Sequence, residues 1–101
     1  LIRLDRKSLM DYIDDVDKDR LKFNFDVNEF SSEEVNVNAV NNRIEIHGKR
    51  KVTKDGETST EEYNRAYELP DNVDPETVTS TFFKDGVLTV ELPVPAIEEM
   101  K

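Results

Sequence analysis

The chain has 101 residues, enough for one domain, and it carries a net charge of −9, with 37% charged and 36% hydrophobic residues. A chain of this length buries roughly 65% of its unfolded surface, which suffices for a modest core. The negative charge argues against nucleic acid and anionic membranes as partners, because binding either depends on Lys and Arg. The absence of cysteine excludes disulfides and cysteine-based metal sites. No apolar run is long enough to span a bilayer.

Residues 1–19 differ from the rest of the chain and predict a short N-terminal helix. Ser8 is the expected N-cap. An apolar stripe with helical spacing follows, made of Leu9, Tyr12, Ile13 and Val16. The acidic run 14–19 is expected to end the helix. Two interpretations stay open: the helix packs against its own domain, or it is an arm that docks on a partner subunit or an unfolded client protein.

From Leu21 onward the hydrophobic period changes to two, which is typical of half-buried strands. Residues 21–27 predict the first strand. Ser31 and Glu34 have the spacing of a capping box for one helical turn, and residues 35–39 predict a second strand. A third strand is expected at 44–48, followed by a polar, turn-rich segment at 49–60.

The rest of the chain continues this pattern. Residues 61–69 and 77–83 are expected to be extended. Asp85-Gly86 is a tight turn, because glycine tolerates positive φ, and a last strand follows with Leu88, Val90 and Leu92 on one face and Pro93 at its end. Short strands with hairpin turns predict an all-β fold, an antiparallel β-sandwich. The two cysteines and core tryptophan of immunoglobulins are missing, so other sandwiches stay open.

Several motifs across residues 20–95 together resemble one family. They are the segments 25–35, 44–49 (Ile-Glu-Ile-His-Gly-Lys), 63–70, 69–75 and 82–93, the last of which contains Asp-Gly-Val-Leu. This pattern is similar to the small heat-shock proteins, the Hsp20 family, whose shared unit is the α-crystallin domain. The resemblance implies an immunoglobulin-like β-sandwich. It divides the chain into an N-terminal arm (1–19), an α-crystallin domain (20–93) and the start of a C-terminal extension (94–101).

The family resemblance also implies a dimer interface. The family's interface arginine falls on Arg65, next to Tyr63 on the same strand. A carboxylate from the preceding loop would pair with it, with Asp55 aligning best and Glu57 and Glu61 as alternatives. Arginine suits such pairing because its planar fork binds a carboxylate through two hydrogen bonds. The other interpretation is an exposed surface pair worth at most about 1 kcal/mol.

A second expected site is a groove for partner or client segments between residues 35–40 and 77–83. The positions that match the family's apolar groove are Val37, Ala39, Val78 and Ser80. Burying two aliphatic side chains there would supply roughly 3–6 kcal/mol before ordering costs. The alternative is that these residues are ordinary core between two sheets. The tail residues 94–97 lack the spacing of the family's Ile-x-Ile/Val docking motif.

The residue inventory offers no catalytic, cofactor or metal site. His47 is the single histidine, so no histidine cluster or catalytic triad can be assembled. The adjacent pairs Glu33-Glu34 and Glu61-Glu62 are not expected to act together, since neighbours on a strand point to opposite faces. No glycine-rich phosphate loop is present, which fits a chaperone that hydrolyses no ATP.

The resulting hypothesis is an ATP-independent holdase domain that forms a homodimer and binds partly unfolded client proteins in the cytoplasm. The alternatives are a monomeric co-chaperone of the p23 type, which binds one folded partner, and a structural or secreted sandwich. An enzyme is the least expected class. The chain begins at Leu1 rather than Met, and we expect it to be a fragment of a longer protein.

Overall fold

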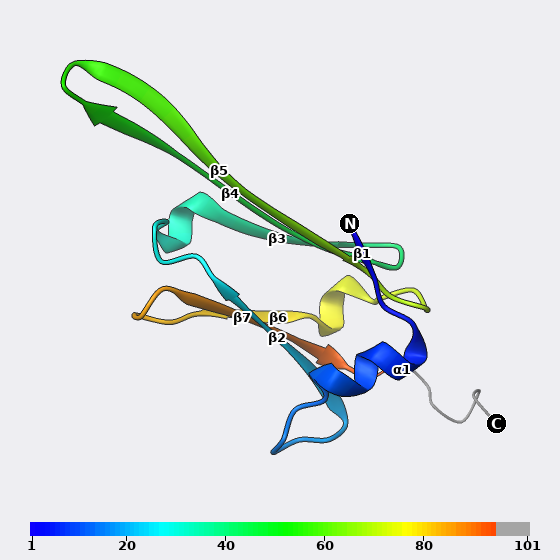
Figure 1. Cartoon of the computed structure of the whole chain (residues 1–101). Helices are drawn as coiled ribbons and strands as arrows, with labels where there is room; N and C mark the ends of the chain where they lie inside the picture. Colours follow the sequence, from blue (N-terminus) through cyan, green and yellow to red (C-terminus); the bar gives the residue numbers. More distant parts are fainter. Residues whose placement is uncertain (95–101) are drawn as a thin grey trace.

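The computed structural model describes residues 1–94 and shows two β-sheets stacked face to face, with one short helix at the N-terminus (Figure 1). In chain order the elements are β1 (Ile2–Arg3), α1 (Arg6–Leu9), η1 (Met10–Tyr12), β2 (Arg20–Asp26), η2 (Ser32–Glu34), β3 (Val35–Val40), β4 (Arg43–Lys54), β5 (Glu57–Glu68), η3 (Pro75–Thr77), β6 (Thr79–Phe82) and β7 (Val87–Pro93). The prediction of an all-β sandwich with a short N-terminal helix is confirmed. The predicted extension from residue 95 onward lies outside the described residues.

The sheets have four and three strands, in the orders β1-β5-β4-β3 and β2-β7-β6. All pairings are antiparallel except that of β1, which runs parallel to β5. Among residues 1–94, no helix is long and apolar enough to cross a membrane.

The three-stranded sheet forms from the alternating segments that the sequence predicts. Along β2, Leu21, Phe23 and Phe25 are buried and alternate with polar residues. Phe23 lies opposite Val90 of β7, and Leu88, Val90 and Leu92 face the same core, as expected. A single-residue slip would turn the apolar side chains of a strand toward water, so the shared core sets the register.

The four-stranded sheet buries Ile44 and Ile46 of β4 against the other sheet. At the next inward position, Gly48 leaves room for the Phe30 ring, whose Cδ1 would lie 3.4 Å from an added Cβ. Tyr63 lies opposite Gly48 on β5 and contacts the Phe30 ring edge-on, with centroids 6.3 Å apart. The predicted capping box is present, since Ser31 N–H donates to the Glu34 carboxylate at 2.8 Å. This hydrogen bond fixes the backbone directly after Phe30.

The prediction of a turn-rich segment at 49–60 is wrong for most of its length. β4 continues to Lys54 and β5 begins at Glu57, so the two strands form one long hairpin that extends beyond the sandwich (Figure 1). Only Asp55 and Gly56 form the turn, with φ of 54° and 80°, as a two-residue hairpin loop requires. No core faces this part of the hairpin, so its strands lack the apolar alternation that would have revealed them.

The predicted helix begins and ends earlier than expected. Asp5, not Ser8, is the N-cap: its carboxylate accepts a hydrogen bond from Ser8 N–H at 2.7 Å. This hydrogen bond lowers the pKa of the Asp5 carboxyl. The helical segment ends at Tyr12, since Ile13 is extended and forms a β-bridge with Leu21. Val16 is therefore not part of the apolar stripe and is 94% exposed.

The turn at Gly86 packs closely on Asn28, and a substitution at Gly86 tests this contact. Gly86 has φ of +85°, and an added Cβ would lie 2.4 Å from the Cα of Asn28. We expect Gly86→Ala to lower the free energy of unfolding by about 2–4 kcal/mol, because strain and a backbone clash add. Gly56→Ala is the matched control, with φ of +80° and nothing within 4 Å, and should cost about 1 kcal/mol. Urea unfolding measures both, and equal costs would contradict the close packing of Gly86 on Asn28.

Candidate functional site

The strand edge of β5 is the first candidate site. β4 pairs with all of β5 on one side. On the other side β1 covers only Tyr67 and Glu68. Within residues 1–94, the backbone from Glu57 to Ala66 therefore has no strand on this second side. A long open edge is a template for pairing with another chain, and it is here that the predicted dimer residues Glu61, Tyr63 and Arg65 lie.

Arg65 is exposed and its guanidinium lies over the ring of Tyr63, 4.7 Å from the ring centroid. Its Nη1 donates a hydrogen bond to the Asn64 carbonyl at 2.9 Å. Among the described residues no carboxylate is within ion-pair distance of it. An exposed cation held over an aromatic ring is well placed to receive a carboxylate from outside the chain.

The expected partners of Arg65 occupy different places. Asp55 and Glu57 lie at the far end of the hairpin, and Glu57 is eight residues from Arg65 along β5, roughly 27 Å in an extended strand. Neither reaches Arg65 within one chain. Glu61 lies on the same face of β5 as Arg65, and its carboxylate is paired with the Arg50 side chain of β4, with Nε and Oε2 3.2 Å apart.

Arg50 is a residue that the sequence interpretation missed. It lies opposite Glu61 on the neighbouring strand and also donates a hydrogen bond to the Glu29 carbonyl. Arg50 thus connects the hairpin to the loop that follows β2. Because 49–60 is predicted as a turn-rich segment and not as two paired strands, the prediction does not contain this pair. Counting outward from Asp55-Gly56 places Arg50 opposite Glu61.

The second candidate site is a hollow at the open side of the sandwich. It lies between β3 and β6, the outer strands of the two sheets, with η3 beside it (Figure 1). Its volume is about 250 Å³, and it is lined by Val37, Asn38, Ala39, Pro75, Val78 and Ser80. All four predicted groove residues thus lie around one hollow. Three of them are half-buried and Ser80 is exposed, so this set is not fully enclosed core.

The N-terminal arm is the third candidate site, and most of it is engaged within the chain. Leu9 is 5% exposed. Tyr12 stacks on Phe23 with ring centroids 4.5 Å apart and meets Tyr67 edge-on at 5.9 Å. Burial in this cluster raises the pKa of the Tyr67 hydroxyl. Leu9, Tyr12 and Ile13 therefore contact the chain's own core, and docking them elsewhere would require the arm to detach.

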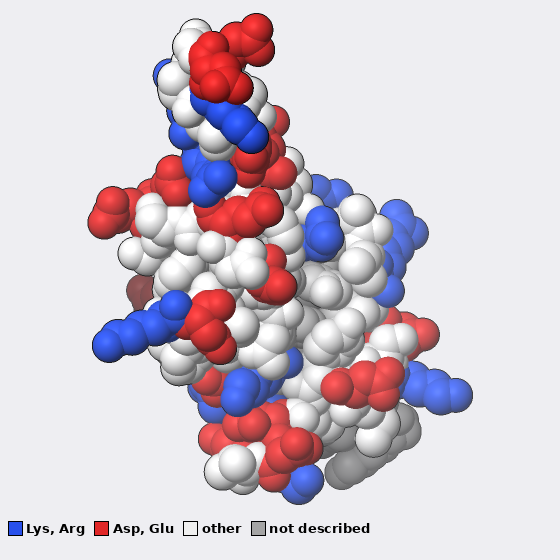
Figure 2. All heavy atoms as spheres, turned by 60° about the vertical axis from the view of Figure 1, so that its left-hand side comes forward, with Lys and Arg blue, Asp and Glu red and all other residues white. Residues whose placement is uncertain are grey.

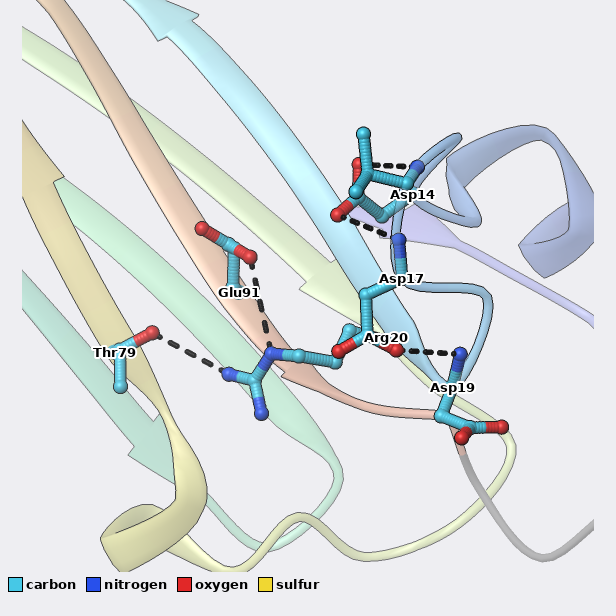
Figure 3. Close-up of polar contacts among 7 residues, drawn as sticks. Asp14, Asp17, Asp19, Arg20, Thr79 and Glu91 are labelled. Atoms are coloured by element: carbon cyan, nitrogen blue, oxygen red, sulfur yellow. Dashed lines mark hydrogen bonds and ion pairs between the residues drawn. The ribbon is translucent and has the colours of Figure 1, made fainter.

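The acidic run that follows the arm forms a compact loop. The Asp14 carboxylate accepts hydrogen bonds from the amides of Val16 and Asp17, and the Asp17 carboxylate accepts one from the amide of Asp19 (Figure 3). Among residues 1–94, no group of three or more His, Asp or Glu side chains is placed to hold a metal ion. The Asp14 and Asp17 carboxylates thus stabilise the turns of this loop by accepting hydrogen bonds from its backbone.

At the end of this loop, the Arg20 side chain of β2 contacts the other two strands of the three-stranded sheet. Its Nε lies 3.8 Å from the Glu91 carboxylate on β7, and its Nη2 donates a 3.4 Å hydrogen bond to the Thr79 hydroxyl on β6 (Figure 3). All three groups are on the outer face of the sheet, where an ion pair of this kind contributes up to about 1 kcal/mol.

Two stacked sheets, a projecting hairpin and a hollow between the outer strands define the class as an α-crystallin-type β-sandwich. The sequence profile of the Hsp20/alpha crystallin family matches residues 13–101. Because this match takes in most of the chain, the protein belongs to the Hsp20/alpha crystallin family. Membership supports a chaperone-type role.

Known relatives agree with this assignment. The chain is 43% identical over 79 residues to the alpha-crystallin B chains of Anas platyrhynchos and Homo sapiens, covering 77% of this chain and 45% of each relative. It thus spans a little less than half the length of these relatives. Among solved structures, the rat alpha crystallin domain superimposes with a TM-score of 0.66 at 31% identity, covering 76% of this chain and 81% of that one. Stress-induced protein 1 from Caenorhabditis elegans gives 0.67 at 26% identity, covering 76% and 79%.

The packing of the arm yields a second prediction. Leu9→Ala removes a buried side chain and should lower the free energy of unfolding by about 2–4 kcal/mol. Val16→Ala, at an exposed position four residues after Tyr12, should change it by less than about 0.5 kcal/mol. Chemical denaturation of both variants checks this. Equal, negligible effects would mean that the arm is not docked on the sandwich.

Proposed function

We propose that the chain is an ATP-independent holdase domain that binds partly unfolded proteins and blocks their aggregation. The observation that carries this proposal is the hollow between β3 and β6, whose half-buried Val37, Ala39 and Val78 are open to a partner. Family membership supports the same role. Occupancy by two aliphatic side chains would yield roughly 3–6 kcal/mol before ordering costs, which suits reversible capture.

The surface charge is consistent with a protein partner. On the face in Figure 2, Lys and Arg side chains are interspersed with Asp and Glu, with uncharged surface between them. Together with the net charge of −9, this supports unfolded proteins rather than nucleic acid or a membrane as partners. No catalysis, nucleotide or cofactor is part of the proposed mechanism. The lack of cysteine fits a reducing compartment such as the cytoplasm.

We further propose that two copies of the chain pair through the open edge of β5, with Arg65 binding a carboxylate of the other copy. Support comes from the unpaired backbone between Glu57 and Ala66 and from the exposed guanidinium of Arg65. A monomer that binds one folded partner, as in p23, is the alternative that the tests below distinguish.

The holdase role predicts that this chain suppresses the light scattering of a heat-labile client protein without ATP, near equimolar ratio. Ser80→Glu should abolish most of this suppression, because it places a charge beside the aliphatic side chains of Val37, Ala39 and Val78 that a client segment would cover. Thr81→Glu is the matched control: it adds the same charge to the same strand, on the opposite face. Suppression unaffected by Ser80→Glu would move client binding away from the hollow. No suppression by the unmodified chain would contradict client binding within these residues.

The dimer predicts that Arg65→Gln shifts the chain toward monomer. Two ion pairs are lost in each dimer, each worth about 0.5–1 kcal/mol, so the dissociation constant should rise about tenfold. Arg43→Gln, an exposed arginine on β4, is the control and should leave the constant unchanged. Sedimentation equilibrium measures both, and identical profiles for the two variants would exclude Arg65 from the interface.

A further inference from the structure

The chain contains two Asp-Gly pairs, Asp55-Gly56 and Asp85-Gly86, and the fold holds them very differently. In such a pair the glycine nitrogen can attack Cγ of the aspartate before it, because glycine has no side chain to shield its amide. After hydrolysis the main chain runs through the aspartate side chain, which is the isoaspartate form. This reaction needs no enzyme, so the contacts around each pair decide which of the two reacts.

Both reacting groups of Asp85-Gly86 are engaged in hydrogen bonds. Gly86 N–H donates to the Phe83 carbonyl at 3.0 Å, and the Asp85 carboxylate accepts a hydrogen bond from Val87 N–H at 3.2 Å. Gly86 is also buried and packs on Asn28, whose Cα would lie 2.4 Å from an added Cβ. The Gly86 nitrogen therefore approaches Cγ of Asp85 only after these contacts have opened.

Asp55-Gly56 lies at the tip of the hairpin and is not held in this way. The hairpin projects beyond the two sheets at this point (Figure 1). Both residues are exposed, and a Cβ on Gly56 would meet nothing within 4 Å. Among residues 1–94, neither the Asp55 carboxylate nor Gly56 N–H takes part in a hydrogen bond. Both reacting groups are thus free.

The backbone at Asp55 is also easier to rearrange than the backbone at Asp85. Asp55 has φ of 54°, in the left-handed region that is unfavourable for a residue with a side chain. The ladder of β4 and β5 holds it there, with Lys54 and Glu57 as the last pair. Opening such an exposed end of a ladder takes little free energy, so the turn readily samples other conformations.

We propose that Asp55 is a site of spontaneous isoaspartate formation and that the fold protects Asp85 from it. The Gly56 nitrogen bonds to Cγ of Asp55, and one carboxylate oxygen leaves as water with the amide proton and a proton from solvent. Water then cleaves the cyclic imide at the Asp55 main-chain carbonyl. One water is released and one is consumed, so the mass is unchanged and no oxidant takes part. The new α-carboxylate is the group that a repair carboxyl methyltransferase would recognise.

The modified residue does not fit the turn that it forms. Isoaspartate adds one methylene to the main chain at Asp55, whereas the two-residue loop depends on a fixed turn geometry. The adjoining pair of Lys54 and Glu57 belongs to a part of the hairpin that has no core beneath it. The ion pair of Arg50 and Glu61 lies further along the ladder. We therefore expect the modification to loosen the hairpin between its tip and this ion pair.

Peptide analysis of the aged chain tests the proposal. The purified chain is kept at physiological temperature and neutral pH, then digested with a protease that cleaves after glutamate. The peptides 46–57 and 77–91 each contain one Asp-Gly pair and no other aspartate, and their isoaspartyl forms separate by chromatography at identical mass. Isomer should accumulate about thirtyfold faster in 46–57, because two hydrogen bonds of ordinary net strength must open at Asp85 first.

Two controls separate the effect of the fold from that of the sequence. In urea that unfolds the chain, both peptides should isomerise at similar rates. With a repair methyltransferase and labelled methyl donor, Asp55→Ser should lose the methyl acceptance of the aged chain, whereas the matched variant Asp85→Ser should keep it. Equal rates for the two peptides in the folded chain would overturn the proposal. So would isomer at Asp55 that appears in urea but not in the folded chain.

Hydrogen exchange of the aged chain against the fresh chain tests the consequence for the hairpin. Amides of residues 53–58 should exchange about fivefold faster in the isomerised fraction, as the loss of one ordinary hydrogen bond implies. Those of β7 serve as the internal control and should be unchanged. Equal protection of 53–58 before and after ageing would contradict the loosening of the turn.

Discussion

The aromatic contact among Tyr12, Phe23 and Tyr67 is the interaction on which the other features depend. Phe23 belongs to the three-stranded sheet, Tyr67 to the four-stranded sheet and Tyr12 to the N-terminal arm, and the three rings meet within 6 Å of one another. The contact therefore sets the spacing of the sheets at one side of the sandwich. It also holds the arm in place, and through the arm it holds β1 beside the end of β5.

Among residues 1–94, no pair of aromatic rings joins β3 to β6 at the opposite side of the sandwich. A hollow lies between β3 and β6, and the side chains around it are of modest size, among them Val37, Ala39, Val78 and Ser80. The two places thus differ in side-chain volume: large rings fill the space where the arm docks, and smaller residues surround the hollow.

Strands that bury one face against the core could be predicted from the sequence, and strands that bury neither face could not. The strands β2 and β7 show clear alternation because each buries one face. The outer half of the β4–β5 hairpin has no core beneath it, so only Asp55-Gly56 marks it. β1 has two residues, too few to show a period. The residues around the hollow were located through family resemblance, and the partner of Arg65 stayed open because no carboxylate of residues 1–94 lies within ion-pair distance of it.

The long hairpin also bears on the order in which the chain folds. Its contacts are local and radiate from a two-residue turn, and hairpins of this kind form in roughly 1–10 μs. The pairing of β2 with β7 joins opposite ends of the described chain, so its loop-closure entropy must be offset before it becomes stable. We therefore expect the β4–β5 hairpin to be present early and β1 to add late. In that order of events the whole edge of β5 is uncovered first, and β1 then covers Tyr67 and Glu68.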